Sequence, residues 1–150
     1  MAAIRPAVAA DAEPATACVR AAYAPYVERI GREPAPMAAD QAALIARGRV
    51  WVADEPGAGV VGVLVLVPRR EALLLESVAV LPAFQGRGIG RLLIAFAEEH
   101  ARRLDLSAVE LYTNERMTEN LRLYPALGYE ETGRATQAGF ARVFFQKRIA

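Results

Sequence analysis

The first third of the chain combines one short extended segment with positions that have helical spacing. Residues 4–8 predict a strand. Apolar side chains then recur at every third or fourth position from Asp11, a candidate N-cap, to about residue 30, which predicts a helix. Residues 40–46 predict a second, shorter helix with an acidic cap. We therefore expect the order strand, helix, helix at the N-terminus.

From Gly48 onward, runs of β-branched and leucine residues alternate with two further helical patterns. The predicted elements are strands at 49–55, 60–68 and 72–82, a helix at about 88–104, a strand at 107–113, a helix at 117–128, and strands at 129–134 and 139–149. The order β-α-α-β-β-β-α-β-α-β-β mixes hairpins with crossover helices. It predicts an α/β protein with one mixed sheet and helices on its faces.

Composition and charge limit the classes of protein to consider. The chain has 150 residues, 54% hydrophobic and 23% charged, which fits one folded domain spanning residues 1–150 and excludes overall disorder. Its 18 basic and 17 acidic residues are interspersed and give a net charge of +1. Because nucleic-acid binders usually carry a clustered basic face, we expect no nucleic-acid partner.

Cysteine content and apolar run length indicate the compartment. Cys18 is the only cysteine, so the chain forms no internal disulfide and no thiolate metal site, and we expect no metal. The longest apolar run, 59–67, is far shorter than the ~20 residues of a membrane span, and the N-terminus lacks a signal-peptide core. We expect a cytoplasmic protein with no membrane partner.

Three glycines at alternate positions follow the strand at 72–82, in the stretch FQGRGIGRLL. A glycine-rich turn that opens a helix is suited to bind a phosphate, because the first amides of the helix lack partners. Arg87 and Arg91 can add charge-assisted hydrogen bonds. The dinucleotide motif G-x-G-x-x-G does not fit, since Arg91 stands where its third glycine belongs, and a Walker loop would need Lys followed by Ser or Thr. These mismatches disfavour a nucleotide-dependent oxidoreductase.

The hexapeptide Gln85-Gly86-Arg87-Gly88-Ile89-Gly90 spells Q-x-x-G-x-G after the strand ending VAVLP. Together with the downstream segment ENLRLYPALGYEETG, it resembles the GNAT N-acetyltransferase superfamily. The resemblance runs from residue 4 to residue 149 and is weakest between 11 and 48. It implies the acyl-CoA N-acyltransferase fold, a single mixed, mostly antiparallel sheet of six to seven strands flanked by helices.

The resemblance also implies an activity. The expected reaction moves an acetyl group from acetyl-CoA to a primary amine of a small molecule, by direct attack in a ternary complex. A protein or peptide acceptor, and a non-catalytic acyl-CoA sensor, are the alternatives. The resemblance further suggests a homodimer, formed by pairing of strands or sheet edges near the C-terminus. The sequence does not identify the amine or the acyl group.

The resemblance assigns the cofactor contacts by position. The pyrophosphate of coenzyme A is expected on the glycine loop, and the pantetheine arm along the backbone of the preceding strand. The Val78 amide is the expected oxyanion donor, and the side chains of Val78 and Val80 are expected in the core. The full expected set is Val78, Ala79, Val80, Gln85, Gly86, Arg87, Gly88, Ile89, Gly90, Arg91, Asn120 and Tyr124.

Acetyl transfer to an amine needs a proton acceptor and a proton donor. Glu76, the only carboxylate in its strand, is the candidate base, with Ser77 able to share a water. The alternative for Glu76 is an ion pair or a strand-edge cap, with a water relay as the base. Tyr124 matches the tyrosine that serves the leaving thiolate in the superfamily, the alternative being a packing role, and Pro125 should bias it away from helical geometry.

Two further groups of residues complete the expected site. Asn120, four residues before Tyr124, is preferred over Asn114 for the pantetheine amides, the alternative being a cap or surface role. The acceptor is expected over the first helix and the loop after it. The residues assigned to it are Tyr23, Tyr26, Arg29 and Met37, which equally fit an ordinary half-buried helix.

Overall fold

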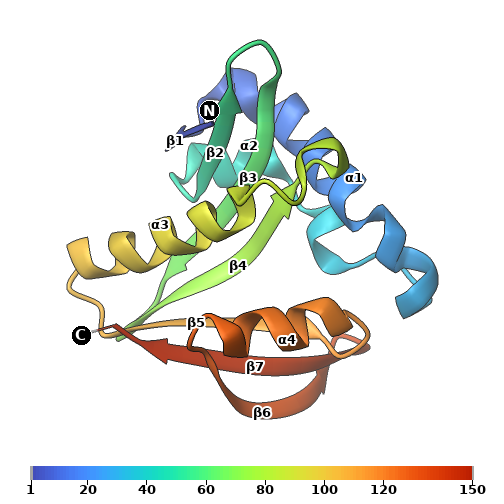
Figure 1. Ribbon diagram of the computed structural model, residues 1–150, viewed down its shortest axis with the longest axis vertical. Coiled ribbons are helices and arrows are strands. Elements are labelled where there is room, and N and C mark those ends of the chain that lie inside the picture. Colours follow the sequence, from blue (N-terminus) through green and yellow to red (C-terminus); the bar gives the residue numbers. More distant parts are fainter. Residues whose placement is uncertain (1, 150) are drawn as a thin grey trace. The chain divides into compact units, whose positions relative to one another are not determined.

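The structure is a computed structural model that describes residues 2–149. It contains a seven-stranded mixed sheet flanked by helices, with strand order β1-β2-β3-β4-β5-β7-β6 (Figure 1). The elements are β1 Ala3–Pro6, α1 Ala12–Ile30, α2 Gln41–Ala46, β2 Val50–Glu55, β3 Gly59–Pro68, β4 Ala72–Val80, α3 Ile89–Arg103, β5 Ala108–Asn114, α4 Thr118–Ala126, β6 Glu130–Gln137 and β7 Phe140–Arg148. Short 3₁₀ turns lie at Ala9–Asp11, Ala35–Ala38 and Pro82–Phe84. This order confirms the predicted mixed sheet.

The chain divides into two compact units. The N-terminal unit comprises residues 1–66 and 77–96, and the C-terminal unit comprises residues 67–76 and 97–150. The strand β4 contributes its first part to the C-terminal unit and its last part to the N-terminal unit. None of the helices within residues 2–149 combines the length and apolar character needed to cross a bilayer.

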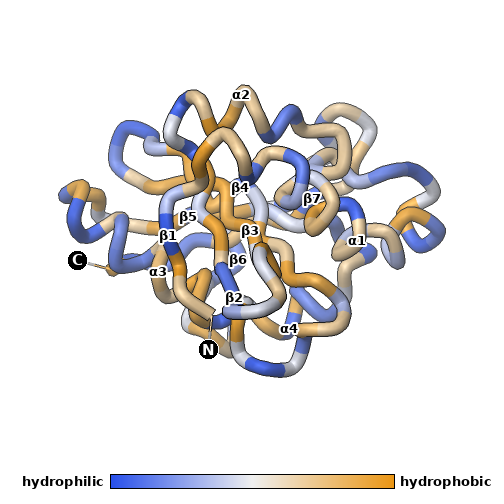
Figure 2. Tube along the Cα trace, turned by 90° about the horizontal axis from the view of Figure 1, so that it is seen from above, coloured by the Kyte–Doolittle hydropathy of each residue, from blue (hydrophilic) through white to orange (hydrophobic). Residues whose placement is uncertain are grey.

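In the N-terminal unit, β1, β2 and β3 form an antiparallel meander. Residues 60–66 of β3 are all buried, which explains the unbroken apolar run there, visible as hydrophobic colour along β3 in Figure 2. Gly62 lets α3 approach this strand closely, because a Cβ at that position would lie 3.1 Å from the side chain of Leu93. The packing of α3 on β3 fixes the position of the N-terminus of α3.

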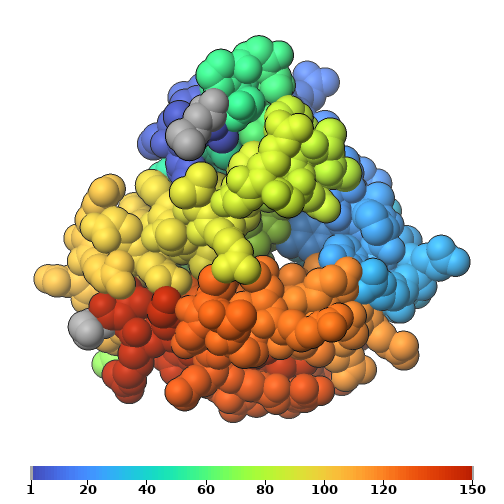
Figure 3. Space-filling view, in the orientation of Figure 1, coloured from blue at the N-terminus to red at the C-terminus, as the bar shows by residue number. Residues whose placement is uncertain are grey.

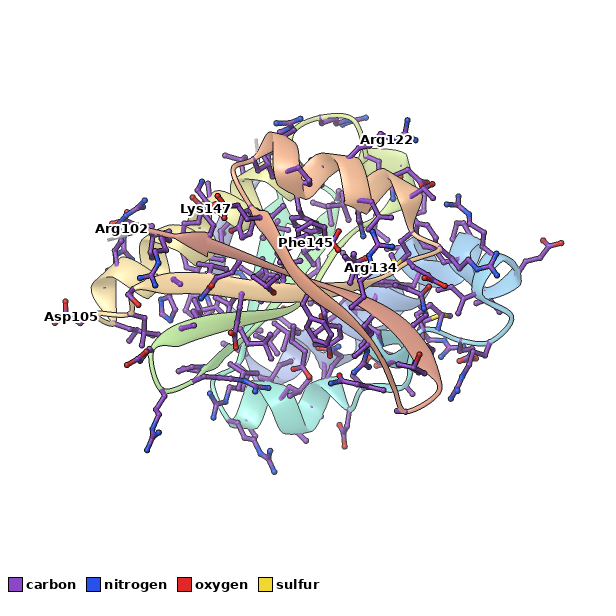
Figure 4. The ribbon with its side chains drawn as sticks, turned by 90° about the horizontal axis from the view of Figure 1, so that it is seen from below. Arg102, Asp105, Arg122, Arg134, Phe145 and Lys147 are labelled. Atoms are coloured by element: carbon purple, nitrogen blue, oxygen red, sulfur yellow. The ribbon has the colours of Figure 1, made fainter. Side chains whose placement is uncertain are left out.

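In the C-terminal unit, β5 pairs in parallel with β4 and antiparallel with β7, and β6 completes the hairpin with β7. The pairing of β4 with β5 covers Ala72–Leu75 against Ala108–Leu111. Phe145 of β7, labelled in Figure 4, lies on the side of the sheet that α4 covers. Its ring packs at a tilt against that of Tyr124, with 5.9 Å between ring centroids. One face of this part of the sheet is thus covered by α4.

The two acidic helix caps expected from the sequence have different outcomes. Asp40 is confirmed, since its carboxylate accepts from the Ala43 amide at 3.1 Å. Asp11 is not a side-chain cap of α1. Its carboxylate accepts instead from the Val8 amide at 2.8 Å and from both terminal nitrogens of Arg5, at 2.8 and 3.1 Å. A charged donor on β1 therefore outcompetes the first-turn amides of α1.

The pairing with Arg5 holds the pKa of buried Asp11 below its ordinary value of 3.8. We expect Asp11→Asn to lower the free energy of unfolding at pH 7 by about 1–3 kcal/mol, because charge-assisted hydrogen bonds are lost. A depressed folded-state pKa gives stability that is complete above the unfolded-state pKa and is lost as pH falls toward the folded-state value. Denaturant unfolding of both proteins should therefore show a difference that shrinks below pH 4.

Glu131→Gln is the control, because its two-pronged pair with Arg134 is exposed and should matter little to stability. An Asp11→Asn protein as stable as the parent at pH 7 would show that the Asp11–Arg5 pair does not stabilise the fold.

Candidate functional site

The glycine-rich turn adopts backbone conformations that only glycine tolerates well. Gly86 has φ +80° and Gly88 has φ +84°, both left-handed, and a Cβ added at either position would meet no atom within 4 Å. Glycine is therefore required there by the backbone angle and not by crowding. Residues 85–88 are exposed, and the segment lies at the surface in Figure 3 as part of the yellow-green stretch.

The turn leads directly into α3, as predicted. The first hydrogen bond of the helix runs from the Leu92 amide to the Gly88 carbonyl at 3.0 Å. The amides of Ile89, Gly90 and Arg91 precede this bond and have no acceptor within the helix. Together with the helix dipole, which places roughly half a positive charge here, they form an anion-binding end.

Two side chains of the turn stabilise its shape. The Gln85 side-chain amide donates to the Val80 carbonyl at 3.1 Å and so ties the turn to the last residue of β4. The guanidinium of Arg87 lies over the Phe84 ring, 4.8 Å from its centroid. Arg91 is exposed in the first turn of α3. Both arginines thus remain at the surface beside the free amides.

The last part of β4 differs from the expectation in one respect. Ser77 and Ala79 are buried, whereas Val78 and Val80 are only half-buried, so the expected core positions of the two valines were wrong. The alternation of a strand places the odd-numbered residues on the buried face. The Val78 carbonyl accepts a hydrogen bond from the Tyr23 hydroxyl at 3.3 Å. A residue expected to bind the acceptor is therefore joined to the strand expected to carry the thioester.

The other expected acceptor residues fall into two groups. Tyr26 packs beside Tyr23 with 6.4 Å between ring centroids, and the Arg29 guanidinium lies 4.8 Å from the Tyr26 centroid. Met37, in contrast, is buried, and its carbonyl accepts from Arg20 at 3.0 Å. The three α1 residues therefore form a continuous half-exposed stack, while Met37 lies in the interior.

Tyr124 lies inside α4 and is 3% exposed. The expectation that Pro125 displaces it from helical geometry was wrong. Near the end of a short helix, proline removes only one backbone hydrogen bond, and the Tyr124 carbonyl accepts from the Leu127 and Tyr129 amides, both at 3.0 Å. Burial raises the pKa of the Tyr124 hydroxyl above its ordinary value of 10.0. At neutral pH the hydroxyl therefore stays protonated and is a hydrogen-bond donor.

A charged cluster that we did not predict supports Tyr124. Tyr129 packs edge-on against Tyr124 at 5.7 Å between centroids and donates its hydroxyl to Glu98 at 3.0 Å. Lys147, the only lysine of the chain, donates to the other Glu98 oxygen at 3.0 Å. The sequence offered one signal for this cluster. Glu98 stands four residues after Ile94 and three residues before Ala101, both buried, so this spacing places a carboxylate on the buried side of α3.

The remaining expected residues lie in the C-terminal unit. The Asn120 side-chain amide donates to the Thr113 hydroxyl at 3.0 Å, which ties α4 to β5. The Asn114 side-chain oxygen accepts from the Arg116 amide at 2.9 Å and so stabilises the turn after β5. Glu76 is half-buried and follows Leu75, the last β4 residue paired with β5. The roles expected for Asn120 and Glu76 stay predictions.

Comparison with known proteins points to one family. Residues 46–131 match the family model described as an acetyltransferase (GNAT) domain. No curated protein matches the chain in sequence. Among solved structures, the PaiA N-acetyltransferase from Thermoplasma acidophilum in complex with coenzyme A is similar, with 15% identity, coverage of 99% of both chains and TM-score 0.81.

Two further solved structures have the same fold. YncA from Salmonella typhimurium, a putative acetyltransferase with its cofactor acetyl-CoA, has 22% identity over 100% of this chain and 95% of its own, with TM-score 0.75. The ribosomal-protein-S18-alanine N-acetyltransferase from Escherichia coli has 16% identity over 100% and 95%, with TM-score 0.76. At these identities the likeness concerns the fold.

We expect Gly88→Ala to weaken coenzyme A binding by about tenfold or more, because a left-handed alanine costs about 1–2 kcal/mol or forces the turn to move. Gly57→Ala is the matched control, since Gly57 has φ +82° and equally open surroundings in the β2–β3 turn. Calorimetric titration should show that only the first variant changes the dissociation constant. Equal affinities of the two variants would contradict the assignment of the turn.

Burial raises the pKa of the Cys18 thiol to about 12, only partly opposed by a backbone hydrogen bond at Leu81. Because the thiolate is the reactive form, we expect native Cys18 to resist Ellman's reagent at pH 8, where the buried thiol stays protonated. Unfolding in urea should release one reactive thiol per chain. Fast modification of the native protein would show that Cys18 is accessible.

Proposed function

Because the chain belongs to the GNAT acetyltransferase family, we propose that it transfers an acetyl group from acetyl-CoA to the primary amine of a small molecule. The amine attacks the thioester directly while both substrates are bound. Cys18 is buried in α1 with a raised pKa, which argues against an acyl-cysteine intermediate.

One observation carries this proposal, namely the turn between β4 and α3. Two left-handed glycines and the unpaired first amides of α3 form a cradle for an anion, and the side chains of Arg87 and Arg91 add positive charge beside it. The pyrophosphate of coenzyme A has the charge and size for such a cradle. The residues present therefore fit coenzyme A as co-substrate.

The backbone of β4 supports the second part of the proposal. The Val78 amide is the group we assign to the thioester oxygen, where negative charge develops as the amine attacks. The hydrogen bond from Tyr23 to the Val78 carbonyl holds this stretch of backbone in place. Preorganised donors of this kind stabilise the transition state because they need no rearrangement during the reaction.

Proton movements are assigned to Glu76 and Tyr124. A lysine-like amine has a pKa of about 10.4, so its deprotonation at pH 7 costs about 4–5 kcal/mol, and Glu76, directly or through a water beside Ser77, accepts that proton. Tyr124 donates a hydrogen bond to the departing sulfur. Since burial raises the pKa of Tyr124, full proton transfer to a thiolate of pKa about 8.5 is uphill, and the hydrogen bond is its main contribution.

We expect the wild-type protein to release free thiol from acetyl-CoA when a suitable primary amine is added. Amino acids, polyamines, aminoglycosides and peptides make up the acceptor panel, and the buried Cys18 leaves the thiol signal clean. Tight coenzyme A binding without thiol release from any amine would favour a sensor. Release only with peptides would favour a protein or peptide acceptor.

We expect Tyr124→Phe to lower kcat by about 10- to 100-fold while the affinity for coenzyme A stays within about twofold, because a hydrogen bond formed at the leaving group is lost. Steady-state kinetics together with calorimetric titration separates these two effects. A fully active Tyr124→Phe protein would remove Tyr124 from the reaction.

A further inference from the structure

The sheet face opposite Tyr124 and Phe145 carries an arginine held on aromatic rings. Arg142 of β7 is half-buried, and its guanidinium carbon lies 4.2 Å from the centroid of Tyr112 on β5 and 5.7 Å from that of Phe140. Its Nη1 donates to the Gln137 side-chain oxygen at 3.1 Å. These contacts hold the guanidinium beside the two rings.

Arg142 has no carboxylate partner within 4 Å among residues 2–149, which distinguishes it from its neighbour Arg134. A guanidinium has five N–H donors in a planar fork, and stacking on a ring leaves the edge of that fork available. The edge matches the two oxygens of a carboxylate. Arg142 is therefore preorganised for an anion that the described residues do not supply.

The strand register places Glu76 next to the part of β5 that carries Tyr112. Tyr112 pairs with Phe144 and Asn114 pairs with Arg142, so Tyr112 and Arg142 share one face of the sheet. The pairing of β4 with β5 ends at Leu75 and Leu111, and Glu76 and Tyr112 are the next residues of the two strands. The candidate base therefore follows the last paired residue of β4, and the arginine lies over a ring of β5, the strand between β4 and β7.

We propose that Arg142 binds a carboxylate of the acceptor, so that the substrate is an amino acid: a primary amine with a carboxylate a few bonds away. In this proposal Glu76 serves the amine of such a molecule and the Arg142 fork binds its carboxylate. This inference rests on the proposed function and specifies its acceptor. The aromatic rings beneath the guanidinium offer an apolar surface to the rest of the molecule.

The test uses matched acceptors that differ in one group. Free amino acids, including those with the amine at the far end of the chain, are compared with their carboxamides and with the amines that lack the carboxyl group. For the best acceptor, wild-type protein should prefer the acid over the carboxamide by at least about tenfold in kcat/KM, because a bidentate ion pair is involved.

Substitution then assigns the preference to one side chain. Arg142→Gln should raise KM for the acid about 10- to 100-fold with little change in kcat, and should leave the carboxamide unaffected. Arg142→Lys keeps the charge but not the planar fork, so its KM for the acid should lie between those of the wild type and Arg142→Gln. Arg134→Gln, on the neighbouring strand, is the control and should match the wild type (Figure 4).

A binding measurement keeps this inference separate from the proposed function. Calorimetric titration of acids and carboxamides into the protein saturated with coenzyme A reports recognition without turnover. Acid-selective binding that Arg142→Gln abolishes supports the inference even if no thiol is released, and in that case the proposed transfer alone fails.

Several results would overturn the inference. These are binding of no acid in the panel, equal recognition of acid and carboxamide by the wild type, or an unchanged acid preference in Arg142→Gln. A thermal melt and a coenzyme A titration of Arg142→Gln confirm that the variant is folded, and a loss of coenzyme A affinity equal to the loss of acid affinity would also count against a specific role. If Arg142→Gln does not fold, the acid preference of Arg142→Lys is measured in its place, and an unchanged preference would likewise overturn the inference.

Discussion

The anion-binding end of α3 is the feature on which the rest of the structure depends. A strand must stop, turn sharply and start a helix within a few residues, so that unpaired amides converge at one place. Gly86 and Gly88 make this possible by adopting left-handed angles, and Gln85 holds the turn to the end of β4. Gly62 then lets α3 lie close to β3, which keeps the helix end in position. Four residues of little chemical reactivity thus create the proposed cofactor site.

The side chains that we propose for the reaction are held in place by specific contacts. Tyr23 is fixed by the Val78 carbonyl, and Tyr124 is fixed by its place in α4 and by the ring of Tyr129. The Glu98 carboxylate accepts hydrogen bonds from both Tyr129 and Lys147 and so holds the Tyr129 ring against Tyr124. Burial keeps the Tyr124 hydroxyl protonated, which suits a donor to sulfur more than an acid that gives up its proton.

Local patterns predicted the elements well, because alternation, glycine turns and proline stops act within a few residues. The order of strands and helices, the start of α3 and the Asp40 cap were all confirmed. The errors concern competition over longer distances. Asp11 binds Arg5 of β1 rather than the amides of α1, and Val78 and Val80 occupy the less buried face of β4. The stacking of Arg142 on Tyr112 joins residues thirty positions apart, which no local pattern reveals.

We propose that backbone amides of the glycine turn hold the pyrophosphate of coenzyme A. Amide chemical shifts of Gly86, Gly88 and Gly90 in ¹⁵N-labelled protein test it directly, with coenzyme A compared against pantetheine, which lacks the pyrophosphate. Saturating coenzyme A should move all three resonances strongly, whereas pantetheine should leave them in place. Unmoved glycine resonances in protein saturated with coenzyme A would contradict it.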